Sequence, residues 1–216
     1  MSLWRAVVNL TIPGECLLCG DADCPVSRAP ICDACWRSIP SSIVRVSGPP
    51  SLMGVHSLGP YDGPLGTLVC QAKYRSRLGI VDVLSRRLGA ALAGCFHVDV
   101  VTHVPIHWSR RWRRGFDQGE RIGRGVGAVM GVPFVPLLTR RHGPQQVGQS
   151  ATERKRLQPS NFELFQGSVP RRVLLVDDVR TTGASLHAAA RVLNSAGAEQ
   201  VWGATLCHQN ERNLYK

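Results

Sequence analysis

The sequence predicts an α/β protein in which helices flank a mostly parallel β-sheet, preceded by a small N-terminal metal-binding module. Two observations lead to this prediction. In the second half of the chain, β-branched apolar runs alternate with helix-like segments, an order that usually produces parallel strands joined by right-handed crossovers. Near the N-terminus, four cysteines fall as two CxxC pairs, a spacing typical of zinc sites. A chain of 216 residues has room for one domain with a small appendage.

The N-terminal module is predicted at residues 1–50 and the main domain at 51–216. An amphipathic helix ended by Pro13 is expected first, although the same run resembles a weak signal peptide without a small-residue cleavage pattern. The two CxxC turns would bring four thiolates around one ion and close its coordination shell, so we expect a structural Zn²⁺. The predicted ligands are Cys16, Cys19, Cys32 and Cys35.

The cysteines have other possible uses besides binding zinc. A redox pair needs only one CxxC, and neither pair has the strand–helix context of a thioredoxin-like motif. Cys24 lies between the pairs, where it could replace a ligand or remain a spare thiol. Cys70, Cys95 and Cys207 lie in apolar runs and are predicted to be core residues.

The net charge of +11 is carried by arginine, because only three of the 26 basic residues are lysines. The planar guanidinium group suits two-point contacts to phosphate, which favours a phosphorylated or nucleic-acid partner. A genome rich in GC, which prefers arginine codons, would produce the same excess. No run approaches the ~18 apolar residues of a membrane span. We therefore expect no membrane span and a cytoplasmic location, which disfavours structural disulfides.

The main domain is predicted to follow a linker near 38–55, where proline, glycine and serine are frequent. Apolar periodicity predicts helices at 61–72, 78–92, 118–130 and 184–195. β-Branched runs predict strands at 97–105, 173–176 and 201–206, with a short strand-like element at 132–138. Polar composition predicts a basic loop at 110–118 and a long, mobile, functional loop at 139–160.

The most informative segment is 173–185, with the sequence VLLVDDVRTTGAS. A buried strand, a tight turn and a helix N-terminus form an anion site, and Gly183 lets the backbone approach a ligand closely. Asp177 and Asp178 would repel that same anion but can accept hydrogen bonds from hydroxyl groups. The segment therefore predicts a ribose 5-phosphate ligand, with direct Mg²⁺ binding by the two acids as the alternative. The chain has no GxxxxGK[ST] motif of a P-loop ATPase.

Segment 173–185 resembles the phosphoribosyl pyrophosphate (PRPP) binding motif of type I phosphoribosyltransferases, and nearly the whole chain is similar to the ComF family of competence-associated proteins. Besides the CxxC pairs and this motif, the matching pieces are 61–65 (YDGPL), 72–74 (AKY), 104–107 (VPIH), 113–118 (RRGFDQ), Gln149, Arg154 and Phe162. Two positions depart from the family. Asp117 stands where asparagine is more frequent, and Leu157 stands where an asparagine commonly follows the arginine.

The resemblance implies a type I phosphoribosyltransferase fold and a set of ligand contacts. Asp177 and Asp178 would hold the ribose hydroxyls and stabilise the positive charge that develops in catalysis, while 181–185 would cradle the 5-phosphate. Mg²⁺ would accompany the pyrophosphate, and the loop around Arg154 would close over the site. The implied PRPP-binding residues are Asp177, Asp178, Val179, Arg180, Thr181, Thr182, Gly183, Ala184, Ser185, Lys73, Pro105, His107 and Arg154.

The basic loop offers a second kind of contact. Tryptophans interleaved with arginines can stack bases and grip the phosphates of single-stranded nucleic acid. The competing interpretation is a loop edge whose tryptophans cover the sheet. The candidate nucleic-acid-binding residues are Arg110, Arg111, Trp112, Arg113 and Arg114, with Trp108 beside them.

Three functions remain open from the sequence. The first is a phosphoribosyltransferase with an unidentified acceptor, associated with DNA uptake or use. The second is a non-catalytic competence accessory that binds single-stranded DNA and a helicase-like ATPase. The third is a PRPP-sensing regulator.

Overall fold

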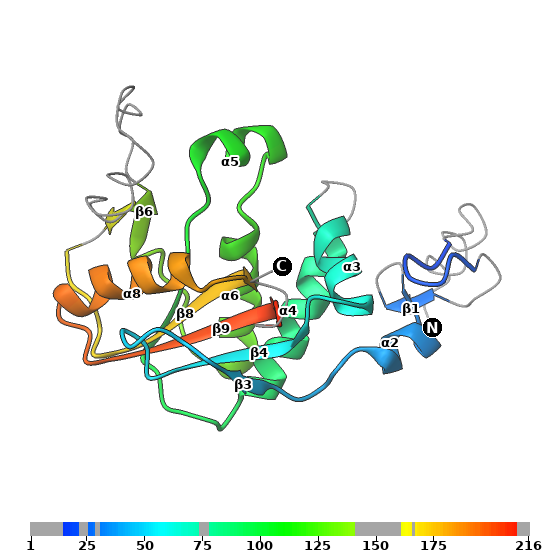
Figure 1. Ribbon diagram of the computed structural model, residues 1–216, viewed down its shortest axis with the longest axis horizontal. Coiled ribbons are helices and arrows are strands. Elements are labelled where there is room, and N and C mark those ends of the chain that lie inside the picture. Colours follow the sequence, from blue (N-terminus) through cyan, green and yellow to red (C-terminus); the bar gives the residue numbers. More distant parts are fainter. Residues whose placement is uncertain are drawn as a thin grey trace.

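The computed structural model describes residues 15–21, 26–28, 31–73, 78–140, 161–165 and 167–210. Its centre is a five-stranded sheet with the order β3-β4-β9-β8-β5 (Figure 1). The strands are β3 (Val44–Val46), β4 (Gly54–Pro60), β5 (Val100–His103), β8 (Arg172–Arg180) and β9 (Gln200–His208). Three of the four pairings are parallel, and only β3 with β4 is antiparallel. The predicted mostly parallel sheet is confirmed.

Helices cover both faces of this sheet. One face packs against α3 (Pro64–Gln71), α4 (Leu78–Leu92) and α6 (Gln118–Met130), and the other against α8 (Ala184–Ser195). Strand β8 illustrates the arrangement, because Leu174 and Val176 belong to the first core and Val173 and Leu175 to the second. Burial on both faces explains why this strand is a continuous apolar run rather than an alternating one.

Helices α4 and α6 approach each other closely where glycine and serine meet. A Cβ atom on Gly125 would lie only 2.0 Å from Oγ of Ser85. On the same pair of helices, Arg121 donates from Nε and Nη2 to the two carboxylate oxygens of Asp82, each at 2.6 Å. The small residues therefore allow the two helices to pack against the sheet as a unit.

The helices at 78–92, 118–130 and 184–195 have the predicted bounds, whereas other elements differ. The first predicted helix begins at Pro64 rather than at residue 61. The loop prediction for 110–118 is wrong for 110–114, because arginine is a good helix former and α5 (Trp108–Arg114) is capped by His107 and by Gly115 with φ 75°. Strand β8 continues beyond Val176 to Arg180.

Two further segments differ from the predictions. The linker near 38–55 includes β3, which pairs with β4. The strand-like element at 132–138 is mostly an isolated bridge between Phe134 and Val101. It leads into β6 (Leu138–Arg140), which pairs with β7 (Phe162–Leu164). The predicted N-terminal helix, Cys24, Arg154 and the predicted loop beyond Arg140 lie outside the described residues.

The N-terminal segment contains β1 (Val26–Arg28), β2 (Ile31–Cys32) and α2 (Asp33–Ser38), and packs against the helices of the main sheet. Nε2 of Gln71 on α3 donates to the carbonyl oxygen of Leu17 at 3.1 Å. The guanidinium of Arg87 on α4 lies 4.3 Å from the ring centroid of Trp36. These contacts join the cysteine-rich segment to α3 and α4.

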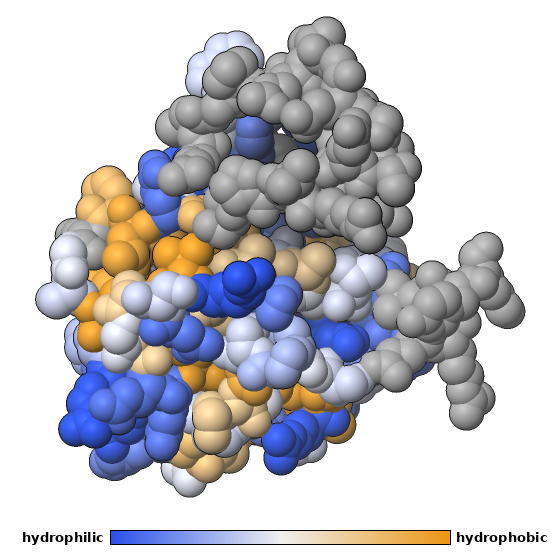
Figure 2. Space-filling model, turned by 60° about the vertical axis from the view of Figure 1, so that its left-hand side comes forward, coloured by the Kyte–Doolittle hydropathy of each residue, from blue (hydrophilic) through white to orange (hydrophobic). Residues whose placement is uncertain are grey.

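The surface combines small polar and apolar areas, and Figure 2 shows hydrophilic and hydrophobic residues side by side on one face. None of the described helices has the length and hydropathy needed to cross a membrane. Of the three cysteines predicted in the core, Cys207 is buried, Cys70 is half-buried and Cys95 is exposed, so the prediction is wrong for Cys95. Cys95 lies just beyond the end of α4, where the chain turns at the surface.

Candidate functional site

A pocket of about 300 Å³ lies at the carboxyl edge of the sheet. Parallel strands end on the same side, so the segments that follow them meet there. Tyr61 follows β4, Gln209 follows β9 and Val104 follows β5, and all three line the pocket. The last part of β8 and the turn after it supply the remaining wall.

The pocket brings together many of the predicted site residues. Those that line it are Lys73, Pro105, Arg114, Asp177, Asp178, Val179, Thr181 and Ser185. It also has lining residues that were not named as ligand contacts, namely Tyr61, Val104, Ile106, Arg140 and Gln209. Three of them, Tyr61, Val104 and Ile106, lie in segments 61–65 and 104–107, which carry the family resemblance. Tyr61 and Gln209 each come directly after a strand. Because these strands are neighbours in the sheet, the two residues lie at the same pocket.

Asp177 and Asp178 occupy the last part of β8, beyond its pairing with β5 but still within its pairing with β9. Oδ1 of Asp177 accepts from the backbone N–H of Asp178 at 2.9 Å, and Oδ1 of Asp178 accepts from the N–H of Val179 at 2.8 Å. Desolvation by the surrounding protein, followed by the negative charge of Asp178, raises the pKa of Asp177 well above its ordinary value. The pair therefore favours a hydroxyl donor or a cation beside it.

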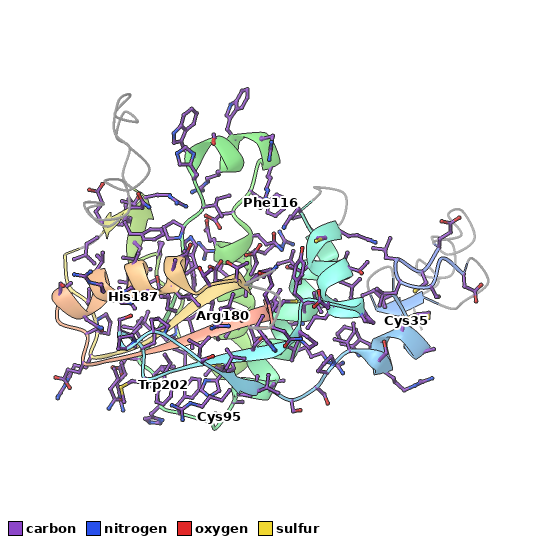
Figure 3. All side chains as sticks on the ribbon, viewed as in Figure 1. Cys35, Cys95, Phe116, Arg180, His187 and Trp202 are labelled. Carbon is purple, nitrogen blue, oxygen red and sulfur yellow. The ribbon has the colours of Figure 1, made fainter. Side chains whose placement is uncertain are left out.

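The turn after β8 provides backbone groups rather than a side-chain cap. Gly183 has φ 78° and precedes α8 without a side-chain capping bond, a conformation that favours glycine. Oγ1 of Thr182 accepts from the N–H of Ala184 at 3.3 Å. Thr182, Gly183 and Ala184 are not among the pocket-lining residues, and Arg180 is buried beneath the turn. Figure 3 shows Arg180 near the end of β8 and His187 farther along α8.

Three cations face the acidic pair from three different parts of the fold. Lys73 follows α3, Arg114 ends α5 and Arg140 ends β6, and all three line the pocket. His107, which was predicted to contact the ligand, instead caps α5, and its Nδ1 lies 2.7 Å from Oγ of Ser109. A pocket with cations opposite two carboxylates suits a ligand that carries both phosphate and hydroxyl groups.

Asp117 is a buried carboxylate under the loop that follows β5. Its Oδ2 accepts from the N–H of Ile106 at 3.2 Å and lies 3.4 Å from Nε2 of His103. Its Oδ1 accepts from the N–H of Glu120 at 3.2 Å and so caps α6. Burial acts to raise the pKa of Asp117, but His103 and these N–H donors outweigh it and lower that pKa.

The tryptophans of α5 point to solvent rather than to the sheet. Trp112 is 85% exposed and Trp108 is 56% exposed, so the interpretation in which they cover the sheet is wrong. Figure 1 shows α5 extending away from the sheet. Arg111 and Arg113 are also exposed, while Arg114 at the end of the helix reaches the pocket. The side chain of Arg110 lies outside the description.

The four predicted zinc ligands form a cluster. Their sulfur atoms all lie within 4.8 Å of one another, and Sγ of Cys19 is 3.9 Å from Sγ of Cys32. A tetrahedral Zn–S₄ site requires S···S separations of about 3.8 Å. Burial acts to raise the pKa of Cys16, but backbone N–H donors outweigh it and lower that pKa to about 6. Burial and the other thiols raise the pKa of Cys35 to about 12. Four cysteine sulfur atoms this close together could bind zinc.

Several known proteins are similar to this chain. Residues 117–216 match the family described as phosphoribosyl transferase domain. Competence protein F of Haemophilus influenzae is 31% identical over 159 residues, 68% of this chain and 69% of that protein. DNA utilization protein YhgH of Salmonella typhimurium is 30% identical over 222 residues, 89% of this chain and 97% of that protein. The solved glutamine PRPP amidotransferase of B. subtilis is 23% identical, covers 63% of this chain and 30% of that chain, and has a TM-score of 0.46.

Proposed function

Because the chain belongs to the family of Competence protein F and DNA utilization protein YhgH, with a phosphoribosyltransferase-like fold, we propose that it binds PRPP in the pocket at the carboxyl edge of its sheet. The observation that carries this proposal is the pairing of two carboxylates with a phosphate-type turn in one pocket. Asp178, Thr181 and Ser185 all line it. A ligand that has vicinal hydroxyls beside a phosphate would bind the carboxylates and the turn at the same time.

In the proposed complex, each wall of the pocket binds one part of the ligand. The hydroxyls of the ribose donate to Asp177 and Asp178. The 5-phosphate lies at the turn of residues 181–185, where the start of α8 contributes backbone N–H groups and the positive end of the helix dipole. The pyrophosphate lies toward Pro105 and Ile106, where Lys73 and Arg114 neutralise its charge.

The same residues suit transfer of the ribosyl group. The bond between C1 of the ribose and the pyrophosphate oxygen breaks, pyrophosphate leaves with the bonding electrons, and a nucleophilic atom of the acceptor bonds to C1. Positive charge develops on the ribose ring, which Asp177 and Asp178 stabilise, while Lys73 and Arg114 stabilise the leaving group. Mg²⁺ on the pyrophosphate would supply further charge neutralisation. As a PRPP sensor, the protein would use only the binding part of this arrangement.

Calorimetric titration with PRPP and Mg²⁺ tests the proposal. The parent protein is expected to bind PRPP, and Asp178→Asn to bind it at least about tenfold more weakly, because it loses hydrogen bonds to a charged acceptor. Asp62→Asn is the matched control, since Asp62 neighbours Tyr61 in sequence but does not line the pocket. If neither the parent protein nor Asp62→Asn binds PRPP, the proposed function is wrong.

A second candidate function is binding of single-stranded DNA through α5, as expected of a competence accessory that works with a helicase-like ATPase. The exposure of Trp108 and Trp112 favours it, because exposed indole rings between arginines offer stacking surfaces and phosphate contacts together. This function is compatible with PRPP binding, since among the described side chains of α5 only that of Arg114 lines the pocket.

We also propose that Cys16, Cys19, Cys32 and Cys35 hold a structural Zn²⁺. The zinc module predicted at residues 1–50 would end before β3, because that strand pairs with β4 and belongs to the central sheet of the domain predicted at 51–216. Four thiolates leave no open coordination position, so the ion stabilises the fold rather than taking part in catalysis. A cytoplasmic location fits a protein that keeps free thiols and uses a phosphorylated metabolite.

A further inference from the structure

The loop at residues 104–107 connects β5 to α5 and forms one wall of the pocket. It belongs to neither element, so individual hydrogen bonds hold it in place. The N–H of Val104 donates to the carbonyl oxygen of Val176 at 2.9 Å, which extends the sheet by one bond. The N–H of Ile106 donates to Oδ2 of Asp117 at 3.2 Å. Ile106 is therefore positioned by a side chain rather than by the sheet.

Asp117 uses its two oxygens for two different elements. Oδ1 accepts from Glu120 and caps α6, while Oδ2 accepts from Ile106 and faces His103. The carboxylate is 2% exposed and His103 is 5% exposed, so water does not compete for these bonds. Strand β5, the pocket loop and α6 are thereby joined at one buried carboxylate.

We propose that Asp117 is a positioning residue that sets the pyrophosphate side of the pocket by holding the backbone of Ile106. This inference rests on the proposed PRPP site. It predicts that loss of the Asp117 contact weakens some ligands and not others. Ligands that carry pyrophosphate depend on Asp117, whereas ribose 5-phosphate, which ends at the ribose, does not.

Asparagine differs from aspartate here by one acceptor. An amide has a single acceptor oxygen. It therefore cannot accept from Glu120 through one oxygen and from Ile106 through another, as the carboxylate does. Asparagine is a favourable N-cap residue, and we expect its oxygen to remain with Glu120. Its NH₂ group would then face the N–H of Ile106, and because both groups are donors they cannot form a hydrogen bond. Asp117→Asn therefore separates the helix cap, which is retained, from the loop contact, which is lost.

The test compares Asp117→Asn with the parent protein by calorimetry, using PRPP, pyrophosphate and ribose 5-phosphate, each with Mg²⁺. The expected result is a loss of about tenfold in affinity for PRPP and pyrophosphate, as for a hydrogen bond to a charged group, with ribose 5-phosphate unchanged. Asp99→Asn is the matched control. Asp99 also accepts from a backbone N–H, that of Arg172 at 3.0 Å, but it precedes β5 at the opposite edge of the sheet.

Hydrogen exchange supplies a readout that needs no ligand. In Asp117→Asn the amide of Ile106 is expected to exchange faster, while that of Glu120 keeps its protection. If Ile106 exchange is unchanged, or if all three ligands weaken equally, Asp117 does not position the loop. If the parent protein binds ribose 5-phosphate but Asp117→Asn keeps full PRPP affinity, only this inference fails. If the parent protein binds none of the three ligands, the proposed function fails and this inference with it.

Discussion

The hydroxyl oxygen of Tyr61 lies 2.8 Å from Sγ of Cys70, which joins the segment after β4 to helix α3 at the wall of the pocket. This contact, together with burial and the charges of Cys70, Cys207 and Asp178, raises the pKa of Tyr61 to about 12. Tyr61, like any tyrosine, is neutral at physiological pH, and its raised pKa keeps the hydroxyl protonated to still higher pH. It can donate a hydrogen bond to a ligand without adding charge.

The first prediction concerns the ionisation of Tyr61. The ultraviolet phenolate signal of the parent protein minus that of Tyr61→Phe should rise near pH 12 rather than near pH ~10, the ordinary value. Since the folded protein holds this proton more tightly, the stabilisation is complete below pH ~10 and is lost as pH rises through 12. Cys70→Ala should move the signal to lower pH, whereas Cys95→Ala, which changes an exposed thiol after α4, should leave it in place.

The second prediction is that Asp177→Asn stabilises the protein without its ligand. A carboxyl whose pKa is raised on folding contributes stability below its unfolded pKa and loses it as pH rises through the folded value. At neutral pH the crowded acidic pair is therefore destabilising, and the gain in Tm from Asp177→Asn should grow as the pH rises above 3.8, the ordinary pKa of the carboxyl. Asp99→Asn should have the opposite sign, because the pKa of Asp99 is lowered by Arg172. Equal Tm shifts for the two variants would contradict this account.

The third prediction links the cysteine cluster to the pocket. Purified protein should contain about one zinc ion per chain by elemental analysis, as expected for four thiolates. Cys35→Ser should lose it, while Cys95→Ser should retain it, because Cys35 and Cys95 lie far apart in the fold (Figure 3). Gln71, which donates to Leu17 of the cluster segment, lies two residues before the pocket residue Lys73. Removal of the metal should therefore also weaken PRPP binding, and unchanged affinity would show that the cluster acts independently.

The fourth prediction concerns α5 and nucleic acid. Trp108→Ala combined with Trp112→Ala should weaken binding of a labelled single strand by roughly 2–6 kcal/mol, the sum expected for two stacking contacts. Fluorescence anisotropy would measure this loss, and affinity of the parent protein should fall steeply with salt. Phe165→Ala is the control, because Phe165 is exposed but lies beyond β7. Equal effects of the two changes would argue against a specific role for α5.

The fifth prediction uses the glycine that supports Tyr61. A Cβ atom on Gly66 would lie 1.7 Å from the carbonyl oxygen of Tyr61, so the backbone must move to admit it. Gly66→Ala should lower the free energy of unfolding by about 1–3 kcal/mol or more, as overpacking does, and displace Tyr61. Gly167→Ala should have little effect, since nothing lies within 4 Å of the added atom. Urea unfolding of both variants would measure the difference.

Local patterns were sufficient for three of the helices and for the cysteine cluster. The helices at 78–92, 118–130 and 184–195 could be predicted because periodicity and flanking glycines act within one segment. The two CxxC pairs predicted a cluster because each turn fixes its own two thiols. The basic segment was misassigned as a loop, since α5 is short and rich in arginine, and its two tryptophans are exposed rather than part of a buried apolar face.

The amino-acid sequence by itself determined that Asp177 and Asp178 stand beside a phosphate-type turn, because all of these residues lie within one short segment. Only the tertiary structure decided which residues face them. Tyr61 and Gln209 reach the pocket because β4 and β9 are neighbours in the sheet, although about 150 residues separate them in the chain. Asp117 holds Ile106 because α6 begins beneath the loop after β5. Strand order and helix placement come from burial over the whole domain, which no local pattern records.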